Sequence, residues 1–149
     1  MVYRIRYLLA IVTALILLNS CKKAVAPIQQ NIAEQYFEQN ILNKDFIVKL
    51  ASDNGSDLTT DYNGYKFRLF KNTMLDGPMT GVRNGDTVRG TWSSNTDYGK
   101  LIINLTLPSA PAEFEFINRP WRFTRKALPV MELAPWGTTE AKILHMERQ

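Results

Sequence analysis

The stretch Met79-Thr-Gly-Val-Arg-Asn-Gly-Asp-Thr-Val-Arg-Gly-Thr-Trp92 decides the fold, because it predicts a β-hairpin. Asn84-Gly85 is the turn, since a two-residue type I′ turn needs positive φ at both of its central residues. After the turn, small or apolar residues alternate with polar ones at the period-two spacing of a half-buried strand. On this returning strand the inward face is expected to carry Val88, Gly90 and Trp92.

Short alternating segments separated by turn residues continue in both directions from this hairpin, from Asp45 to the end of the chain. The predicted strands cover residues 46–50, 65–70, 79–83, 87–93, 101–107, 121–124, 130–133 and 143–147. The clearest inward row is that of Leu101, Ile103, Leu105 and Leu107. Pro108 ends this strand, because proline cannot donate a hydrogen bond to a sheet. One helical turn is predicted at residues 113–118.

Eight short strands joined by tight turns predict an all-β fold. The alternatives are an up-and-down antiparallel barrel and a strongly curved sheet, and we expect the eight-stranded barrel. The interior of such a barrel is either filled by side chains or holds one small ligand, and the strand pattern leaves both open. If a ligand is held, the predicted lining consists of Phe67, Val88, Trp92, Ile103 and Phe123.

A short amphipathic helix is predicted ahead of the barrel, over residues 28–43. Ile32 and Tyr36 share one stripe, and four apolar residues at helical spacing share the adjoining stripe. These four are Ala33, Phe37, Ile41 and Leu42. The polar face consists of Gln, Glu and Asn and lacks the basic residues typical of a membrane-surface helix. We therefore expect the helix to cover one end or edge of the barrel, rather than to bind a partner or a membrane.

The N-terminal stretch has the layout of a bacterial secretory signal. Two arginines precede the apolar run 7–18, which is shorter than the roughly 20 residues of a membrane-spanning helix. Leu18-Asn19-Ser20-Cys21 resembles the lipobox of lipoprotein precursors, in which the Cys is lipidated and begins the mature chain. The alternative is an ordinary signal peptide, or an uncleaved anchor, with an incidental Cys. We expect a signal peptide at 1–20 and a lipidated Cys21 with a tether at 21–30.

Cys21 is the only cysteine, so an internal disulfide is impossible and a free exported thiol needs an explanation. Lipidation supplies one, because several acyl chains on one residue hold a protein to a bilayer more firmly than a single chain. Lys22 follows Cys21 in place of the Asp that is typical of inner-membrane retention. We expect an outer-membrane lipid anchor with the domain facing the periplasm, while exposure at the cell surface stays open.

Several stretches of the sequence carry a family likeness. Besides the lipobox, these are Asp-Tyr-Asn-Gly-Tyr-Lys-Phe at 61–67, Val-Arg-Gly-Thr-Trp at 88–92, Ile-Asn-Arg-Pro-Trp at 117–121 and Leu-His-Met-Glu-Arg at 144–148. With them the chain resembles the small lipocalin-like lipoproteins of Bacteroidetes. The resemblance implies an eight-stranded lipocalin-like barrel without assigned catalytic residues. Gly90-Thr91-Trp92 resembles the Gly-x-Trp signature of true lipocalins, but it lies on the fourth strand instead of the first, so no ligand specificity is carried over.

Composition and motifs exclude several classes of function. Removing the predicted 20-residue signal from the 149 residues leaves 129, enough for one domain. The formal charge of +4 falls to about +2 without the two arginines of the signal, so we expect no nucleic-acid partner. Asp53, Asp57 and Asp61 do not follow the order of a calcium loop. His145 is the only histidine, and no Gly-x-Ser-x-Gly elbow accompanies it. We expect no enzyme activity, no metal and no cofactor.

Some side chains are predicted to face solvent. Trp136 lies in a Pro-Trp-Gly turn and is the best candidate for an exposed aromatic residue, whereas Trp92 and Trp121 have the phase of core residues. The outward phases of the strands also carry Lys66, Arg68, Arg89, Arg122 and Lys126. These basic residues form either a surface for an anionic partner or simply the solvated face of the sheet.

Taken together, these features predict a lipid-anchored, non-catalytic binding module for a small apolar ligand, a glycan or an envelope partner. The alternative is a structural or accessory lipoprotein whose barrel is fully packed and which acts through protein contacts. Empty volume among the predicted lining residues would favour the first function, and interdigitation of the same residues would favour the second.

Overall fold

The computed structural model describes residues 32–125 and 127–149. The predicted signal peptide at 1–20 and the tether at 21–30, with Cys21, lie outside the described residues. The strands are β1 (Asp45–Asp53), β2 (Ser56–Asp57), β3 (Lys66–Leu69), β4 (Asp76–Arg83), β5 (Asp86–Ser94), β6 (Lys100–Leu107), β7 (Pro120–Arg125), β8 (Val130–Pro135) and β9 (Lys142–Arg148). The helical segments are a helix over residues 32–40, the 3-10 helix η1 (Thr59–Tyr62) and α2 (Phe114–Ile117).

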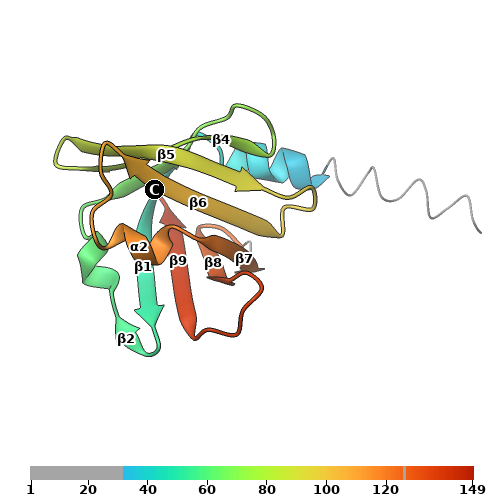
Figure 1. Cartoon of the computed structure of the whole chain (residues 1–149). Coiled ribbons are helices and arrows are strands. Elements are labelled where there is room, and N and C mark those ends of the chain that lie inside the picture. Colours follow the sequence, from blue (N-terminus) through green and yellow to red (C-terminus); the bar gives the residue numbers. More distant parts are fainter. Residues whose placement is uncertain (1–31, 126) are drawn as a thin grey trace, which may run out of the picture.

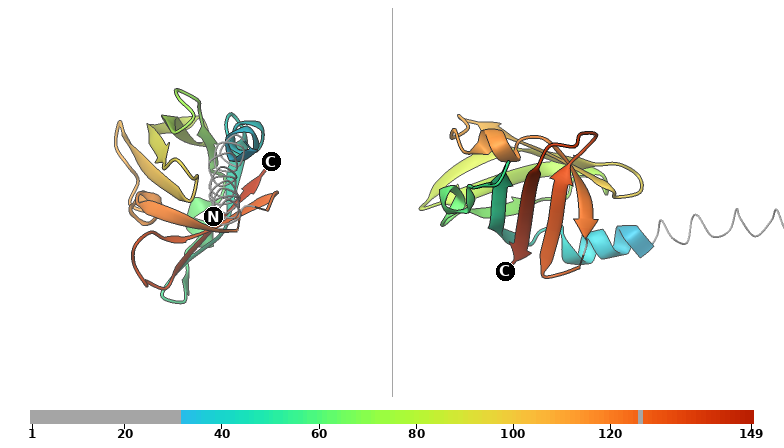
Figure 2. Two further views of the ribbon diagram at one scale, coloured as in Figure 1. Left: turned by 90° about the vertical axis from the view of Figure 1, so that its right-hand side faces the viewer. Right: turned by 90° about the horizontal axis from the view of Figure 1, so that it is seen from below.

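The strands form one antiparallel sheet that closes on itself (Figure 1). β1 and the strands from β3 to β9 pair in chain order, and β9 pairs back with β1. β2 is a separate two-residue strand that pairs antiparallel with the last two residues of β1. The two further views in Figure 2 show the closed ring of strands, with the helix over residues 32–40 beside it. The predicted eight-stranded up-and-down antiparallel barrel, preceded by a short helix, is confirmed.

The hairpin at residues 79–92 forms with the predicted turn. β4 and β5 pair as far as Arg83 and Asp86, and the turn residues Asn84 and Gly85 have φ values of 54° and 93°. Gly90 on β5 is required for the close approach of β5 to β6. A Cβ atom at this position would lie 1.8 Å from the carbonyl oxygen of Asn104 on β6. Only glycine therefore allows the two backbones to approach this closely.

The inward rows of the strands meet in one hydrophobic core. Trp92 and Trp121 are 1% and 0% exposed, as their phase predicts, and Trp136 is 40% exposed. On β9, Leu144 and Met146 are buried on either side of His145, which is on the outward phase and half-buried. Period-two alternation thus predicts the two faces of the sheet over most of its length.

Leu107 departs from this alternation. It was predicted to point inward with Leu105, but its side chain is 61% exposed. The pairing of β5 with β6 steps from Arg89 opposite Leu107 to Gly90 opposite Leu105, so β6 has one extra residue at Thr106. Such a β-bulge reverses the alternation beyond it. Leu107 therefore lies on the outer face with Arg89.

The helix over residues 32–40 closes one end of the barrel. Its buried stripe is the predicted one, with Phe37 2% exposed and with Ile41 and Leu42 buried just after it. The Phe37 ring lies 5.5 Å from the ring of Trp92 and 4.9 Å from that of Tyr98. Asn43, at φ 58°, ends this segment, and its backbone N–H donates to the Leu69 carbonyl. The expectation that the helix covers an end of the barrel is confirmed.

The segment 108–119 closes the opposite end of the barrel. The N-terminal helix packs on Tyr98, which directly precedes β6, whereas the segment 108–119 follows the other end of the same strand. Phe114 and Ile117 of α2 are 0% and 1% exposed. The Asn118 side chain replaces a missing strand partner: its amide accepts from the Leu105 N–H and donates to the Leu105 carbonyl, both at 2.8 Å. The predicted helical turn at 113–118 is therefore present and serves to cap the core.

Tyr98 carries a buried hydroxyl group without a hydrogen-bond partner among the described residues. Its side chain is 1% exposed beneath the helix over residues 32–40, and burial raises the pKa of this phenol. A buried polar group that lacks a partner costs about 1–3 kcal/mol. We therefore expect Tyr98→Phe to raise the free energy of unfolding by about 1 kcal/mol, measured by urea denaturation. A loss of stability would show that the hydroxyl has a partner.

Asp45 and Arg68 join β1 to β3 by a two-pronged ion pair, with both N–O distances 2.7 Å. The hydrogen bond from Arg68 lowers the pKa of Asp45 below its ordinary value of 3.8. Because the folded-state pKa is depressed, the stabilisation is complete about one pH unit above the ordinary pKa of 3.8 and is lost as pH falls through the folded-state pKa. Both groups are partly solvated, so we expect Asp45→Asn to cost about 0.5–1 kcal/mol at pH 7 and clearly less at pH 2. Urea denaturation at the two pH values tests this, with Asp86→Asn as the matched control.

Candidate functional site

The predicted lining residues lie in the barrel interior. Phe67, Val88, Trp92 and Ile103 are 0%, 7%, 1% and 2% exposed, and Phe123 is half-buried and packs against the same core. The first four have almost no accessible surface, so their side chains are interdigitated with their neighbours in the core. The structure brings the five residues into one core, and their role as ligand contacts stays a prediction.

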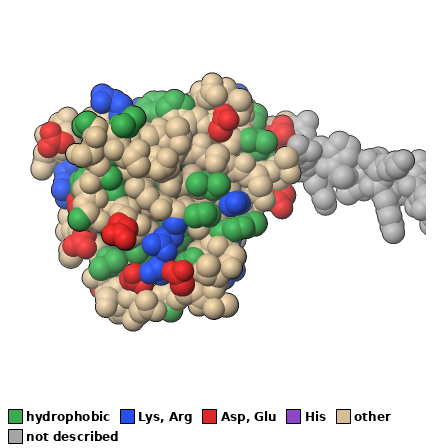
Figure 3. Space-filling view, in the orientation of Figure 1, with side chains coloured by type: hydrophobic (Ala, Val, Ile, Leu, Met, Phe, Trp, Pro, Cys, Tyr) green, Lys and Arg blue, Asp and Glu red, His purple; other side chains and the backbone are tan. Residues whose placement is uncertain are grey.

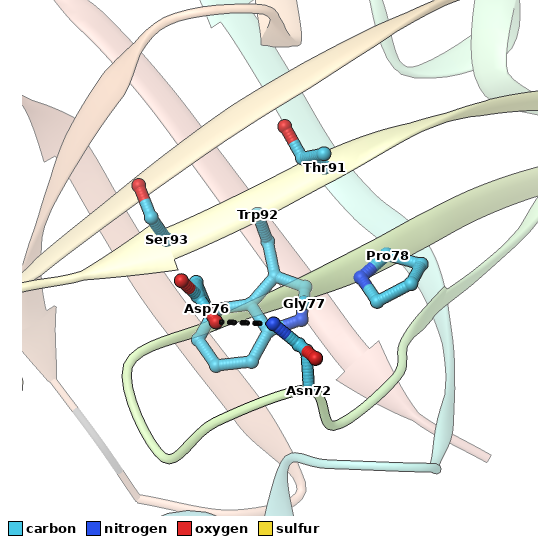
Figure 4. Close-up of a pocket in the computed structure, with 7 residues that line it drawn as sticks. All are labelled: Asn72, Asp76, Gly77, Pro78, Thr91, Trp92 and Ser93. Carbon is cyan, nitrogen blue, oxygen red and sulfur yellow. Dashed lines mark hydrogen bonds between the residues drawn. The ribbon is translucent and has the colours of Figure 1, made fainter.

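An open groove of about 440 Å³ lies on the outer surface beside β4 and β5 (Figure 4). We call it the β4–β5 groove, and it is lined by Asn72, Asp76, Gly77, Pro78, Thr91, Trp92 and Ser93. Thr91 and Ser93 project from one side of β5, whereas the Trp92 ring extends towards β4 behind Asp76 and Asn72. Two hydroxyls, an amide and a carboxylate therefore line the groove together with a proline ring and the backbone of Gly77.

The loop between β3 and β4 forms one wall of this groove. The Trp92 Nε1–H donates to the Phe70 carbonyl at 2.7 Å, across Gly77. The Asn72 Nδ2 donates to the Asp76 carboxylate at 3.2 Å. The Asp76 carboxylate also accepts from the Thr73 hydroxyl at 2.8 Å. The Ser94 N–H of β5 also donates to the Leu75 carbonyl at 2.7 Å. The wall is therefore held by bonds within the loop and by bonds from Trp92 and Ser94, while the hydroxyls of Thr91 and Ser93 remain for a ligand.

A second polar site, the mouth cluster of Tyr65, Arg83 and Glu113, lies where the segment 108–119 crosses the barrel end. The Arg83 guanidinium lies 4.1 Å from the centre of the Tyr65 ring, and its Nη2 lies 3.2 Å from Glu113 Oε1. The Tyr65 hydroxyl donates to the same oxygen at 3.2 Å. Burial and the nearby Glu113 carboxylate raise the pKa of Tyr65.

Beside the mouth cluster is a hollow of about 320 Å³, bordered by Tyr65, Arg83, the start of β5 and residues Pro108, Ser109 and Pro111. Next to it, the Tyr62 hydroxyl donates to the Glu113 carbonyl, and burial raises the pKa of Tyr62. The polar groups of the mouth cluster thus bind one another, which fastens the segment 108–119 to the barrel. Their arrangement accounts for closure of this end without a ligand.

The carboxylates of Asp53, Asp57 and Asp61 do not converge on a common site. Asp53 pairs with Lys142, and Asp57 accepts from the Thr59 N–H at 2.8 Å. The backbone carbonyl of Asp61 accepts from Arg83 at 3.3 Å. Within residues 32–125 and 127–149, no group of three or more His, Cys, Asp or Glu side chains is placed to hold a metal ion. The described part of the chain also has no helix that is long and apolar enough to cross a membrane.

The surface charge is balanced. Four of the 18 basic residues precede position 24, so residues 24–149 carry 14 basic and 14 acidic residues. On the face shown in Figure 3, acidic and basic side chains lie side by side among apolar ones. Lys66, Arg89 and Arg122 have the predicted outward positions, and Arg68 is bound to Asp45, whereas the Lys126 side chain is outside the described residues. The net charge of residues 24–149 is therefore zero at neutral pH.

Sequence reasoning missed the β4–β5 groove, because its wall is a loop between two strands. The Asn-Thr-Met-Leu-Asp-Gly-Pro run at 72–78 is rich in turn formers, which indicates a loop but not where it folds. Gly77 is the informative residue. A Cβ there would lie 1.9 Å from the Phe70 carbonyl oxygen, a contact between residues on different segments. A glycine inside a strand is the only local sign of this close approach.

Comparisons with known proteins bear on the fold. No protein-family model matches the sequence, and no curated protein is significantly similar to it. Among solved structures, a duf4847 family protein from Bacteroides vulgatus ATCC 8482 is similar, with a TM-score of 0.52 and 20% sequence identity. The similarity covers 74% of this chain and 95% of that chain. At this identity the likeness shows the fold alone, so the chain shares the barrel architecture of a Bacteroides protein.

Proposed function

We propose that the protein is a lipid-anchored, non-catalytic binding module of the cell envelope that holds a glycan in the β4–β5 groove. One observation carries the choice of site: the interior side chains are interdigitated, whereas an open groove with unpaired hydroxyls lies on the outer surface. An apolar ligand would need an enclosed apolar cavity. The packed interior therefore favours a ligand bound from outside.

The chemistry of the groove favours a polyhydroxylated ligand. Thr91 and Ser93 each carry a hydroxyl that both donates and accepts, and the Asn72 amide has one further donor and its carbonyl oxygen. Pro78 and the glycine backbone supply a small apolar contact for the C–H face of a sugar ring. Specificity would come from these few placed polar groups.

The groove is tested with residues 22–149, which contain every described core side chain. Purified protein is applied to an array of bacterial envelope polysaccharide fragments. We expect Thr91→Val to weaken the binding of any retained glycan about fivefold, because it removes one hydrogen bond without changing the shape of the side chain. Thr106→Val, at an exposed position of β6 that is not part of the groove lining, is the matched control and leaves binding unchanged.

Two other results would each replace this proposal. A stoichiometric apolar molecule in an organic extract of the natively purified domain would place the ligand in the interior. Absence of any glycan binding, together with a clean extract, would favour the accessory lipoprotein that acts through protein contacts.

The lipid anchor is tested separately. Cys21→Ser in the full-length chain is expected to abolish incorporation of labelled palmitate and to release the protein from the membrane fraction. Cys21 is the only thiol of the chain, so label that persists in the variant would contradict lipidation at this residue.

A further inference from the structure

The outer face of β6, β7 and β8 carries two rows of side chains. Lys100 lies opposite Arg122, and Arg122 lies opposite Ala134. In the next row Ile102 lies opposite Pro120, and the Trp136 N–H donates to the Pro120 carbonyl at 3.0 Å. Leu101, Trp121, Leu133 and Pro135 are buried between these positions, so both rows face outward. We call these six outward residues the β6–β8 face, and they place a pair of cations beside a strip of apolar side chains.

The two cations of this face are unusually placed. Like charges directly opposite one another on neighbouring strands destabilise a sheet. Seven other described basic side chains have a carboxylate within 4.0 Å, for example Arg125 with Glu132. Lys100 and Arg122 have none among the described residues; Lys66 and Arg89 also have none, but those two do not lie opposite one another. The ammonium of Lys100 instead lies 5.2 Å from the centre of the Trp136 ring. The positive charges of the pair are therefore not neutralised by a carboxylate among the described residues.

We propose that the β6–β8 face rests on a bilayer that contains anionic lipid, with Lys100 and Arg122 at the headgroups and Trp136 in the interfacial layer. Lys and Arg gain free energy at an anionic membrane surface, and Trp prefers the membrane–water interface. The face is the outer side of three adjacent strands, and a broad surface of this kind suits a planar partner. Charge complementarity and this composition together favour a bilayer over a soluble anion.

The lengths of the chain segments allow this contact. The proposal rests on the lipid anchor proposed at Cys21, from which residues 21–31 reach up to about 36 Å when extended. This length exceeds the radius of gyration of about 14 Å expected for a domain of this size, so the tether allows the domain to turn on its anchor. Ser93 of the β4–β5 groove lies opposite Ile102 of this face, so the groove begins on the next strand. A membrane contact would thus place the groove beside the bilayer.

The test uses Cys21 as a chemical handle, so that it does not depend on lipidation in the cell. Residues 21–149, which contain the whole described core, are coupled through this single thiol to a maleimide phospholipid in vesicles. The vesicles contain brominated phosphatidylcholine with or without phosphatidylglycerol. Bromine quenches tryptophan on contact, and Trp92 and Trp121 are shielded inside the barrel. We expect quenching with phosphatidylglycerol that is lost in Trp136→Phe and weakened by salt.

Charge reversal supplies the matched comparison. Each cation at the surface is expected to contribute about fivefold, so K100E/R122E should shift the contact equilibrium at least 25-fold and remove the quenching. K66E/R89E makes the same change in net charge with two unpaired cations elsewhere on the barrel and should leave the quenching intact. Absence of quenching, or equal loss in both double variants, would overturn the proposal. So would binding of soluble polygalacturonate through Lys100 and Arg122 without quenching by the vesicles. The proposal of a lipid anchor at Cys21 is tested separately, by palmitate labelling, so its failure can be told apart from failure of the membrane contact.

Discussion

Phe37→Ala is expected to lower the free energy of unfolding by about 3–5 kcal/mol, the range measured for Phe deletions in tightly packed cores. Phe37 comes from the helix over residues 32–40 but packs between Trp92 and Tyr98 at the end of the barrel. Its removal leaves a cavity beneath the helix, bordered by the Trp92 ring on β5 and by the Tyr98 ring in the loop between β5 and β6. Urea denaturation of residues 22–149 measures the loss.

Ile32→Ala is the control for this prediction, because it removes an apolar side chain from the same helix. Ile32 is 62% exposed, so we expect a change within about 0.5 kcal/mol. The difference in the free energy of unfolding between the two variants reports the packing of Phe37 in the barrel, because a change in helix propensity would affect both variants similarly. If Phe37→Ala cost no more than Ile32→Ala, the helix would not be part of the folded domain, and the barrel would be open at this end.

Gly77→Ala is expected to lower the free energy of unfolding by about 3 kcal/mol, and to disrupt the β4–β5 groove. The new Cβ atom would lie 1.9 Å from the Phe70 carbonyl oxygen and 2.9 Å from both the Asn72 nitrogen and the Trp92 Nε1. Two of these atoms belong to the backbone, which cannot turn aside as the end of a flexible side chain can. The loop would have to lift, which breaks the hydrogen bond from Trp92 to Phe70.

Two controls isolate the cause of this loss. Pro78→Ala changes the neighbouring exposed residue and is expected to alter stability by less than about 0.5 kcal/mol. Trp92→Phe removes the N–H group while it keeps a large ring, so it reports the part of the loss that is due to the hydrogen bond. Stability of Gly77→Ala equal to that of the wild type would show that the loop does not cross Gly77 at this distance.

Local patterns in the sequence determined most of the fold. Alternation at period two assigned the inward faces of several strands, and Asn84-Gly85 set the register of the hairpin, because turn chemistry and side-chain direction depend mostly on neighbouring residues. The helical stripe of Phe37, Ile41 and Leu42 likewise identified the buried face of the N-terminal helix. In these cases the residues that make the pattern are also the residues that make the structure.

The tertiary structure decided the features that depend on contacts between distant segments. The bulge at Thr106 turned Leu107 outward, because register depends on which residues of β5 and β6 face one another. The β4–β5 groove exists because the Phe70 carbonyl crosses Gly77 to meet Trp92, 22 residues away. Lys100 and Trp136 meet only because β7 brings β6 and β8 to either side of it. By itself the sequence determined which faces are buried, whereas closure of the barrel determined which exposed residues became neighbours.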